Sequence, residues 1–134
     1  MNIDFIESAL SVAFTSSDFS GATVYKGTDS QELTPESLNI IVACTQLEHV
    51  AGSLWKADID VKLSAPALLG SDSYDSFQTA LDTMTGNTLS NTYMNAYFNS
   101  GDVNFAGLWI NNIKTSQHEH TWVAEISVTM GITQ

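Results

Sequence analysis

Hydrophobic residues near the start of the chain recur every three or four positions, the spacing that places them on one face of an α-helix. These residues are Ile3, Ile6, Leu10, Ala13 and Phe14. Asn2 stands where its side chain can cap the first turn, and Asp4 and Glu7 add negative charge to that turn, where the helix dipole favours it. The pattern therefore predicts an amphipathic helix over residues 3–14.

Strand patterns occupy the next part of the chain. Residues 22–26 indicate a short strand, and residues 27–36 a polar, acidic loop that we expect to be the most exposed segment. Residues 38–47 are a continuous apolar run rich in Ile and Val, which predicts a strand buried on both faces, followed by a turn at residues 49–53. Residues 54–65 alternate between apolar and charged side chains, which predicts a strand with one core face and one charged face. The core face would hold Trp55, Ala57, Ile59, Val61, Leu63 and Ala65, and the outer face Lys56, Asp58, Asp60 and Lys62.

Two helices are predicted after Pro66. The first begins at Ser71, repeats apolar side chains at helical spacing and ends at Gly86. Its core face would hold Tyr74, Phe77, Leu81 and Met84. The second is short, with Asn87 or Thr88 as its cap and residues 99–101 as its exit. Its core face would hold Leu89, Tyr93, Ala96 and Tyr97.

The last part of the chain predicts a hairpin of two strands, residues 103–113 and 120–132, joined by a loop at residues 114–119. That loop is too long for a tight two-residue turn. Strict alternation places one set of side chains of the second strand on a single face. They are His120, Trp122, Ala124, Ile126, Val128, Met130 and Ile132. The order α-β-β-β-α-α-β-β, in one domain over residues 1–134, predicts an α+β fold with a mostly antiparallel sheet and helices packed on one face.

The charge of the chain is strongly one-sided. Fifteen acidic residues stand against four lysines and no arginine, which gives a net charge of -11. Because affinity for nucleic acids comes mainly from cations that neutralise phosphates, we expect no specific nucleic-acid binding. Charged residues make up only 14% of the chain, so uncharged polar residues must cover much of the surface.

The cysteine content and the hydropathy of the chain limit the cellular environments in which the protein can be expected. Cys44 is the only cysteine, so no intramolecular disulfide forms, and its apolar neighbours indicate a buried side chain. The start of the chain lacks the basic region and apolar run of a signal peptide, and no apolar run approaches the roughly 18 residues needed to cross a bilayer. We therefore expect a protein made in the cytoplasm, without membrane contact.

No catalytic pattern is recognisable, and we predict a non-enzymatic protein without a cofactor. The chain has neither a G-x-S-x-G nucleophile elbow nor a glycine-rich phosphate-binding motif. Asp58 and Asp60 are paired carboxylates, but the lysines beside them are typical of solvated cross-strand ion pairs. Trp55, Trp109 and Trp122 lie in strand patterns, which favours core anchors over a platform for an aromatic ligand.

A metal site would have to use the few histidines of the chain. His118 and His120 would point to the same side of a strand, with Glu119 between them and His49 as a further candidate. No third ligand stands at a diagnostic spacing, so a solvated turn is the favoured interpretation. A small metal- or ligand-binding module that uses His118 and His120 remains an alternative.

The succession of segments resembles phage tail terminator and tail completion proteins. It consists of the helix IDFIESALSVAF, then ATVYKG, the strands LNIIVACTQLEHV and SLWKADIDVKL, the helical stretch YDSFQTALDTM, and the hairpin VNFAGLWINNI with HTWVAEISVTM. The likeness is one of pattern and order over nearly the whole chain. It implies a virion structural protein of the neck or tail, a ring that is often hexameric, and neighbours among the tail-tube and head-connector proteins. A component of a phage-derived injection machine of the same architecture is a further alternative.

Polar loops are the natural contact elements in such a ring, because the apolar faces of the strands and helices are already committed to the core. We expect the contacts to use the loop at residues 27–36 and the hairpin end at residues 114–119. The candidate interaction residues are Asp29, Glu32, Glu36, Lys114, Gln117, His118 and Glu119. An acidic lumen would let DNA pass without binding, since like charges repel.

Overall fold

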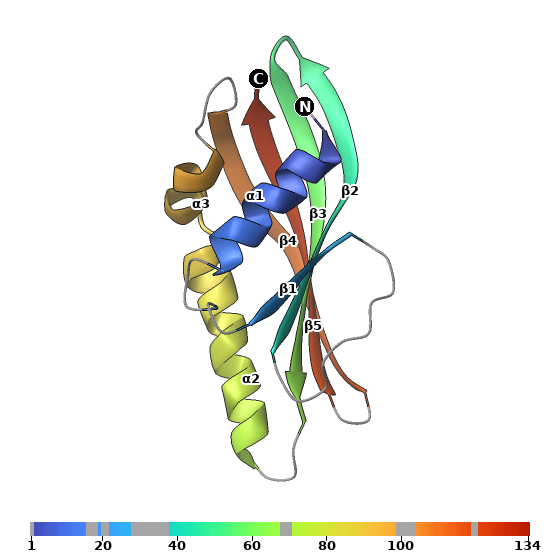
Figure 1. The fold of residues 1–134 in the computed structure, drawn as a ribbon, viewed down its shortest axis with the longest axis vertical. Helices are drawn as coiled ribbons and strands as arrows, with labels where there is room; N and C mark the ends of the chain where they lie inside the picture. Colours follow the sequence, from blue (N-terminus) through green and yellow to red (C-terminus); the bar gives the residue numbers. More distant parts are fainter. Residues whose placement is uncertain are drawn as a thin grey trace.

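The computed structural model describes residues 2–15, 19, 22–27, 38–67, 71–98, 104–118 and 121–134. Three α-helices lie in front of a long, twisted sheet in Figure 1. In chain order the elements are α1 (Ile3–Thr15), β1 (Thr23–Lys26), β2 (Asn39–Ala51), β3 (Leu54–Pro66), α2 (Ser71–Thr83), the π-helical turn η1 (Met84–Thr88), α3 (Asn91–Phe98), β4 (Asn104–His118) and β5 (Thr121–Thr133). The predicted α+β class and the order α-β-β-β-α-α-β-β are confirmed.

The sheet of the described residues has five strands in the order β1-β2-β3-β5-β4. β1 pairs with β2 in parallel, and the other three pairings are antiparallel, as predicted. The chain closes two long hairpins, β2–β3 and β4–β5, and β5 inserts between β3 and β4. The two edges of the sheet are therefore β1 together with the part of β2 beyond it on one side, and β4 on the other.

Helix α1 begins as the sequence predicts. The Asn2 Oδ1 atom accepts a hydrogen bond of 2.8 Å from the backbone N–H of Phe5, which satisfies one of the donors left open at a helix start. The predicted apolar face is fully buried at Ile6, Leu10 and Phe14, whereas Ile3, at the start of the helix, is 42% exposed. This face packs α1 onto the sheet, against both β1 and β2.

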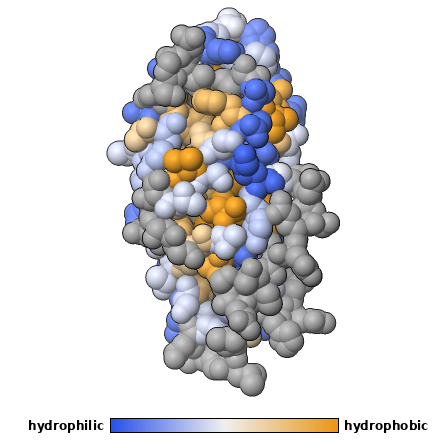
Figure 2. Space-filling model, in the orientation of Figure 1, coloured by the Kyte–Doolittle hydropathy of each residue, from blue (hydrophilic) through white to orange (hydrophobic). Residues whose placement is uncertain are grey.

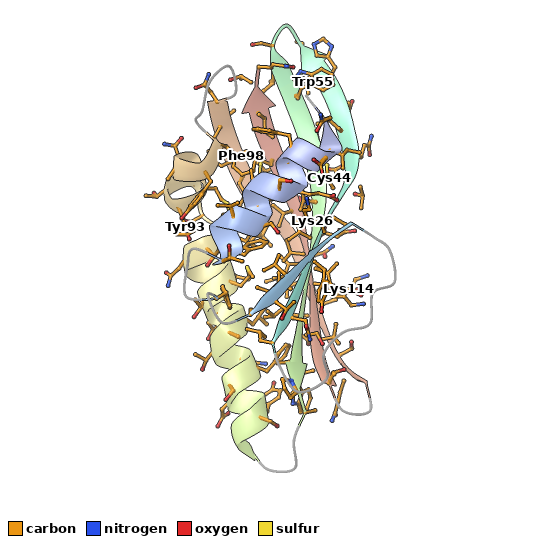
Figure 3. All side chains as sticks on the ribbon, viewed as in Figure 1. Lys26, Cys44, Trp55, Tyr93, Phe98 and Lys114 are labelled. Carbon is orange, nitrogen blue, oxygen red and sulfur yellow. The ribbon has the colours of Figure 1, made fainter. Side chains whose placement is uncertain are left out.

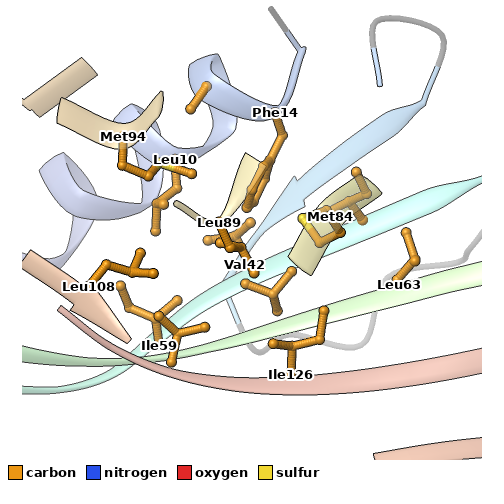
Figure 4. Packing of buried hydrophobic residues seen from close by; sticks show 14 of the residues in the cluster. Leu10, Phe14, Val42, Ile59, Leu63, Met84, Leu89, Met94, Leu108 and Ile126 are labelled. Carbon is orange, nitrogen blue, oxygen red and sulfur yellow. The ribbon is translucent and has the colours of Figure 1, made fainter. Parts of the chain in front are cut away.

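One layer of side chains fills the space between the helices and the sheet. The alternation predicted for β3 is confirmed, because its core-face residues from Ala57 to Ala65 are buried. The same holds for β5 from Ala124 to Ile132. Figure 4 shows side chains of the helical layer, such as Leu10 and Met94, above Ile59 and Ile126 of the sheet. Burial of this apolar surface is the main stabilising contribution to the fold.

Strand β2 is longer than the predicted strand and is buried only in part. It runs to Ala51, so the turn is confined to Gly52 and Ser53. Its first half, up to Cys44, is largely buried, whereas the part from Thr45 onward is mostly exposed. The second half extends past β1, which pairs only as far as Val42. Burial on both faces is therefore correct for half of the strand and wrong for the other half.

The predicted end of the first helix of this region is wrong. The chain does not stop at Gly86 but continues from α2 into the π-helical turn η1, closed by a 2.8 Å hydrogen bond from the Leu89 N–H to the Met84 carbonyl. The wider turn keeps Met84 and Thr88 buried. Tyr74 was expected in the core but is 46% exposed.

Helix α3 has a different cap and a different core face from those predicted. Ser90, not Asn87 or Thr88, caps it, because the Ser90 Oγ atom accepts from the Tyr93 N–H at 3.2 Å. The buried residues of the helix are Met94 and Phe98. Tyr93 and Tyr97 pack at the margin of the core, Leu89 is buried but precedes the helix, and Ala96 is exposed.

The hairpin at the end of the chain is tighter than predicted. β4 continues through the proposed loop to His118, which pairs with Thr121, so only residues 119 and 120 lie between the paired positions. The prediction failed because residues 114–117 carry mostly uncharged polar side chains, which resemble a loop but are also tolerated on a strand exposed on both faces.

The surface of the helix-covered side is mixed. Figure 2 shows that its described residues form scattered hydrophobic and hydrophilic areas rather than one continuous apolar patch. None of the helices that the structure describes combines the length and the hydrophobicity needed to cross a membrane.

Candidate interaction surfaces

The structure describes only part of the predicted contact set. Lys114 and Gln117 lie on β4 and are exposed, and His118 is the last residue of that strand. These three predicted residues are thus brought together at one end of an edge strand. Asp29, Glu32 and Glu36, in the loop at residues 27–36, lie outside the described residues, as does Glu119.

His49 cannot share a metal ion with His118. His49 pairs with Trp55 at the start of β3, whereas the strand end that holds His118 lies across β5 from Pro66. Positions 55 and 66 are roughly 35 Å apart along the strand, at about 3.3 Å per residue. The imidazole of His49 instead contacts the Trp55 ring, with centroids 4.9 Å apart, and its Nε2 atom lies 2.7 Å from the Gly52 carbonyl oxygen.

The part of the chain that the structure describes contains no group of three or more His, Cys, Asp and Glu side chains able to hold a metal ion. The side chains of His118 and His120 and the residue Glu119 are outside that part. The alternative that assigns them a metal or a ligand therefore stays a hypothesis.

The face of the sheet opposite the helices carries a polar network. The Asn111 Nδ2 atom donates to the Thr129 Oγ1 atom at 2.7 Å, and that hydroxyl lies 3.4 Å from the Asp58 Oδ1 atom. The network links β4, β5 and β3 side by side. Thr129 is only 4% exposed, so these hydrogen bonds hold the three strands together on this face.

One cross-strand ion pair forms on the same face. The Lys62 Nζ atom lies 4.0 Å from a Glu125 carboxylate oxygen, and the two residues are register partners in β3 and β5. Both side chains are substantially exposed, so the pair contributes little stability. The expectation of solvated cross-strand pairs is confirmed here, with Glu125 as a partner that the local sequence did not indicate.

Glu7 has a structural role that the sequence did not reveal. Its Oε2 atom accepts a buried hydrogen bond of 2.9 Å from the backbone N–H of Cys44, on β2 beyond the end of β1. The Cys44 side chain is buried, as predicted, and its thiol donates to the Gln46 carbonyl at 3.6 Å. Burial, together with the nearby Glu7 carboxylate, raises the pKa of the Cys44 thiol from 9.0 to about 11, so the thiol is neutral and unreactive at neutral pH.

The tryptophans are less buried than predicted. Trp122 packs between Tyr74 and Phe77 at the margin of the core, and Trp55 is half-buried beside His49. Trp109 is 54% exposed, so its assignment as a core anchor is wrong. The reason is the irregularity between Phe105 and Gly107 in the pairing of β4 with β5, which shifts the alternation and turns Trp109 to the side opposite Phe105, with which regular alternation would place it.

The two halves of β4 differ in the regularity of their pairing with β5 and in their contacts along the outer edge. In the first half, register shifts occur between Phe105 and Gly107 and between Ile110 and Asn112. There the Leu108 N–H donates to the Asn91 Oδ1 atom of α3 at 2.8 Å. The second half, residues 112–117, pairs with β5 one-for-one without a shift and is exposed throughout. We call this segment the regular half of β4.

A hollow lies beside α2. It has a volume of about 620 Å³ and is lined by Phe19, Leu38, Asp75, Ser76, Thr79, Ala80 and Thr83. Asp75 is the one charged side chain among these described lining residues.

No protein-family model matches the chain, and no curated protein matches its sequence.

Proposed function

We propose that this chain is a virion structural protein of a bacteriophage neck or tail, which forms a ring at the end of the tail tube and joins it to the head connector. The observation that carries the proposal is the order of elements, α-β-β-β-α-α-β-β over a single sheet. This is the order on which the resemblance to tail terminator and tail completion proteins rests.

The distribution of apolar surface supports a role in repeated protein contacts. All three α-helices pack on one side of the sheet, and their apolar faces contribute to one core. The polar remainder is suited to contacts in which a few anchors and many near-neutral neighbours share the binding energy. Lys114 and Gln117, both exposed near the end of β4, belong to the proposed contact set, together with the loop at residues 27–36.

Closure of the ring follows from the task of ending a tube. A head-to-tail contact repeated by rotation either closes or continues as a filament, and a terminating protein needs the closed case, for which we propose six subunits. The net charge of -11 fits a lumen through which DNA passes without binding. The same charge opposes assembly of free copies, so the end of the tail tube would be the template that orders the ring.

Imaging of particles tests the proposal. Negative-stain electron microscopy with antibody labelling of this chain should place it in a ring at the neck, and mass measurement of the released ring should give a closed oligomer. Deletion of residues 28–34, in a variant whose circular dichroism matches the parent, should abolish the ring. A subunit that is monomeric or filamentous in its native assembly, or a deletion that leaves assembly intact, would refute the proposal.

A further inference from the structure

We propose that two copies of this chain pair through the regular half of β4, antiparallel and related by a two-fold axis, so that the two sheets continue into each other. This contact differs from the proposed ring contacts in being symmetric and in closing after two copies. Because both contacts use Lys114 and Gln117, we place the pairing in the free chain, and the same segment of one copy cannot make both contacts at once.

The first observation is the position of the strand. β4 is the last strand of the sheet, with 15 residues, and no described strand lies beyond it. An edge strand presents backbone N–H and C=O groups that can pair with another chain, and proteins usually block such edges with bulges, prolines, charges or short strands. The regular half has no bulge and no proline, and its one charged residue is Lys114.

The second observation is exposed apolar surface on both flanks of this edge. Trp109 is 54% exposed and Ile113 is 43% exposed, and they belong to the small set of large apolar side chains exposed to this degree. Ile113 pairs with Ile126, on the helix side, whereas Trp109 pairs with Thr129, on the open side. A strand added along the regular half would therefore cover Ile113 on the helix side, while Trp109 lies just before this half on the open side.

The third observation is charge. In a chain with fifteen acidic residues, residues 104–118 contain none, and Lys114 adds a positive charge. Two copies of net charge -11 repel each other, and the repulsion is least where the facing surfaces carry no negative charge. The β4 strand of a second copy can therefore approach the β4 strand of the first with the least repulsion.

The opposite edge of the sheet does not offer an equivalent partner. β1 has four residues, and beyond it Glu7 occupies the Cys44 N–H. Farther along, β2 pairs regularly only from Gln46 to His49, between two register shifts, and this stretch contains the acidic Glu48. Among the strands that the structure describes, β4 is the one long, regular and acid-free edge that a second copy can present, so the contact is two-fold.

A matched pair of variants tests the proposal. Thr115→Glu places a negative charge in the regular half of β4, and Thr23→Glu makes the same change at an exposed position of β1, on the other edge. Sedimentation equilibrium of the whole chain, at increasing concentration in low and high salt, measures the dimer dissociation constant. With the two-fold axis at Thr115, the two introduced glutamates face each other, and like charges facing across paired strands are destabilising. Thr115→Glu should therefore weaken the dimer by at least about fivefold, whereas Thr23→Glu should leave it within about twofold.

Amide hydrogen exchange identifies the surface used. Exchange of residues 112–117 should slow as the concentration rises through the dissociation constant, and high salt should strengthen the dimer by screening repulsion. A chain that stays monomeric at all concentrations in high salt would overturn the proposal. So would a dimer in which exchange of residues 112–117 does not change, or one that both glutamate variants weaken equally. These measurements use the free chain, whereas the ring is tested separately on the particle itself.

Discussion

The two edges of the sheet show opposite treatments of the same physical problem. At the β1/β2 edge, a helix supplies the missing partner: Glu7 of α1 accepts from the Cys44 N–H, and the apolar face of α1 packs beside it. At the β4 edge, helix α3 supplies an acceptor in the first half of the strand, where the Asn91 Oδ1 atom accepts from the Leu108 N–H. The side chains of residues 112–117, in the regular half of β4, are exposed instead. In Figure 3, Cys44 lies beside α1, whereas Lys114 lies in the lower half of the sheet.

The comparison shows how one fold combines a sealed edge with an available one. A buried N–H without an acceptor costs about 1–3 kcal/mol, so an edge covered by a helix must be satisfied by a side chain of that helix. An exposed edge is satisfied by water at little cost, and that water can later be replaced by a strand. The β1/β2 edge thus contributes to the stability of the fold, whereas the β4 edge can still pair with another strand.

The largest expected effect comes from the packing of α1 over the sealed edge. Leu10 is fully buried, and Leu10→Ala should lower the free energy of unfolding by about 2–5 kcal/mol, because it leaves a cavity under the helix. Ile113→Ala, on the available edge, should change it by less than about 1 kcal/mol. Urea denaturation of both variants measures the difference, and equal losses would contradict the distinction between the edges.

The next effect concerns the acceptor that seals β2. Glu7→Ala removes the partner of the buried Cys44 N–H and should cost about 1–3 kcal/mol. Glu7→Gln keeps a carbonyl oxygen at that place and should cost clearly less. Thermal unfolding ranks the two variants, and a Gln variant as unstable as the Ala variant would show that the charge, not the hydrogen bond, is required.

Alkaline pH should weaken the same edge. The pKa of Cys44 is about 11 in the folded chain against 9.0 ordinarily, so the folded state holds the proton more tightly. The associated stability, on the order of 2 kcal/mol, is present below about pH 9 and is lost as the pH rises to about 11. Denaturation curves of the parent and of Cys44→Ala across this range isolate the contribution, since tyrosines and lysines titrate in both. A parent that loses no more than the variant would contradict the raised pKa.

The smallest effect should come from the half-covered edge. Asn91→Ala removes the acceptor for the Leu108 N–H at a partly exposed position, where water can replace it, so the cost should be about 1 kcal/mol or less. Exchange of the Leu108 amide should accelerate in the variant. If exchange at Leu108 is unchanged, the side chain of Asn91 does not protect this edge.

Periodicity predicted the fold well because the apolar faces of α1, β3 and β5 are governed by local spacing alone. Periodicity failed where contacts between residues far apart in the sequence determine the local conformation. The irregularity near Gly107 shifts the alternation that follows it, which exposed Trp109 against expectation, and the π-helical turn carries the chain past the predicted helix end at Gly86. A single residue of shift changes the face of every later side chain in a strand.

The candidate surfaces were less predictable than the fold. Lys114 and Gln117 were singled out as loop residues and lie instead on a strand, so their exposure is confirmed although their conformation is not. The hydrogen bond from Cys44 to Glu7 joins residues far apart in sequence and leaves no local trace. A usable signal was present at β4, where a long run without acidic residues stands in a highly acidic chain.

Amide hydrogen exchange of the dilute, monomeric chain, followed residue by residue, tests the difference between the edges most directly. The amides of Cys44 and Leu108, whose acceptors are side chains of α1 and α3, should exchange slowly. Within residues 112–115 of the regular half, alternate amides that point away from β5 should exchange fast, and the amides between them slowly. Uniform protection across residues 112–115, or fast exchange at Cys44, would contradict the account of one sealed and one available edge.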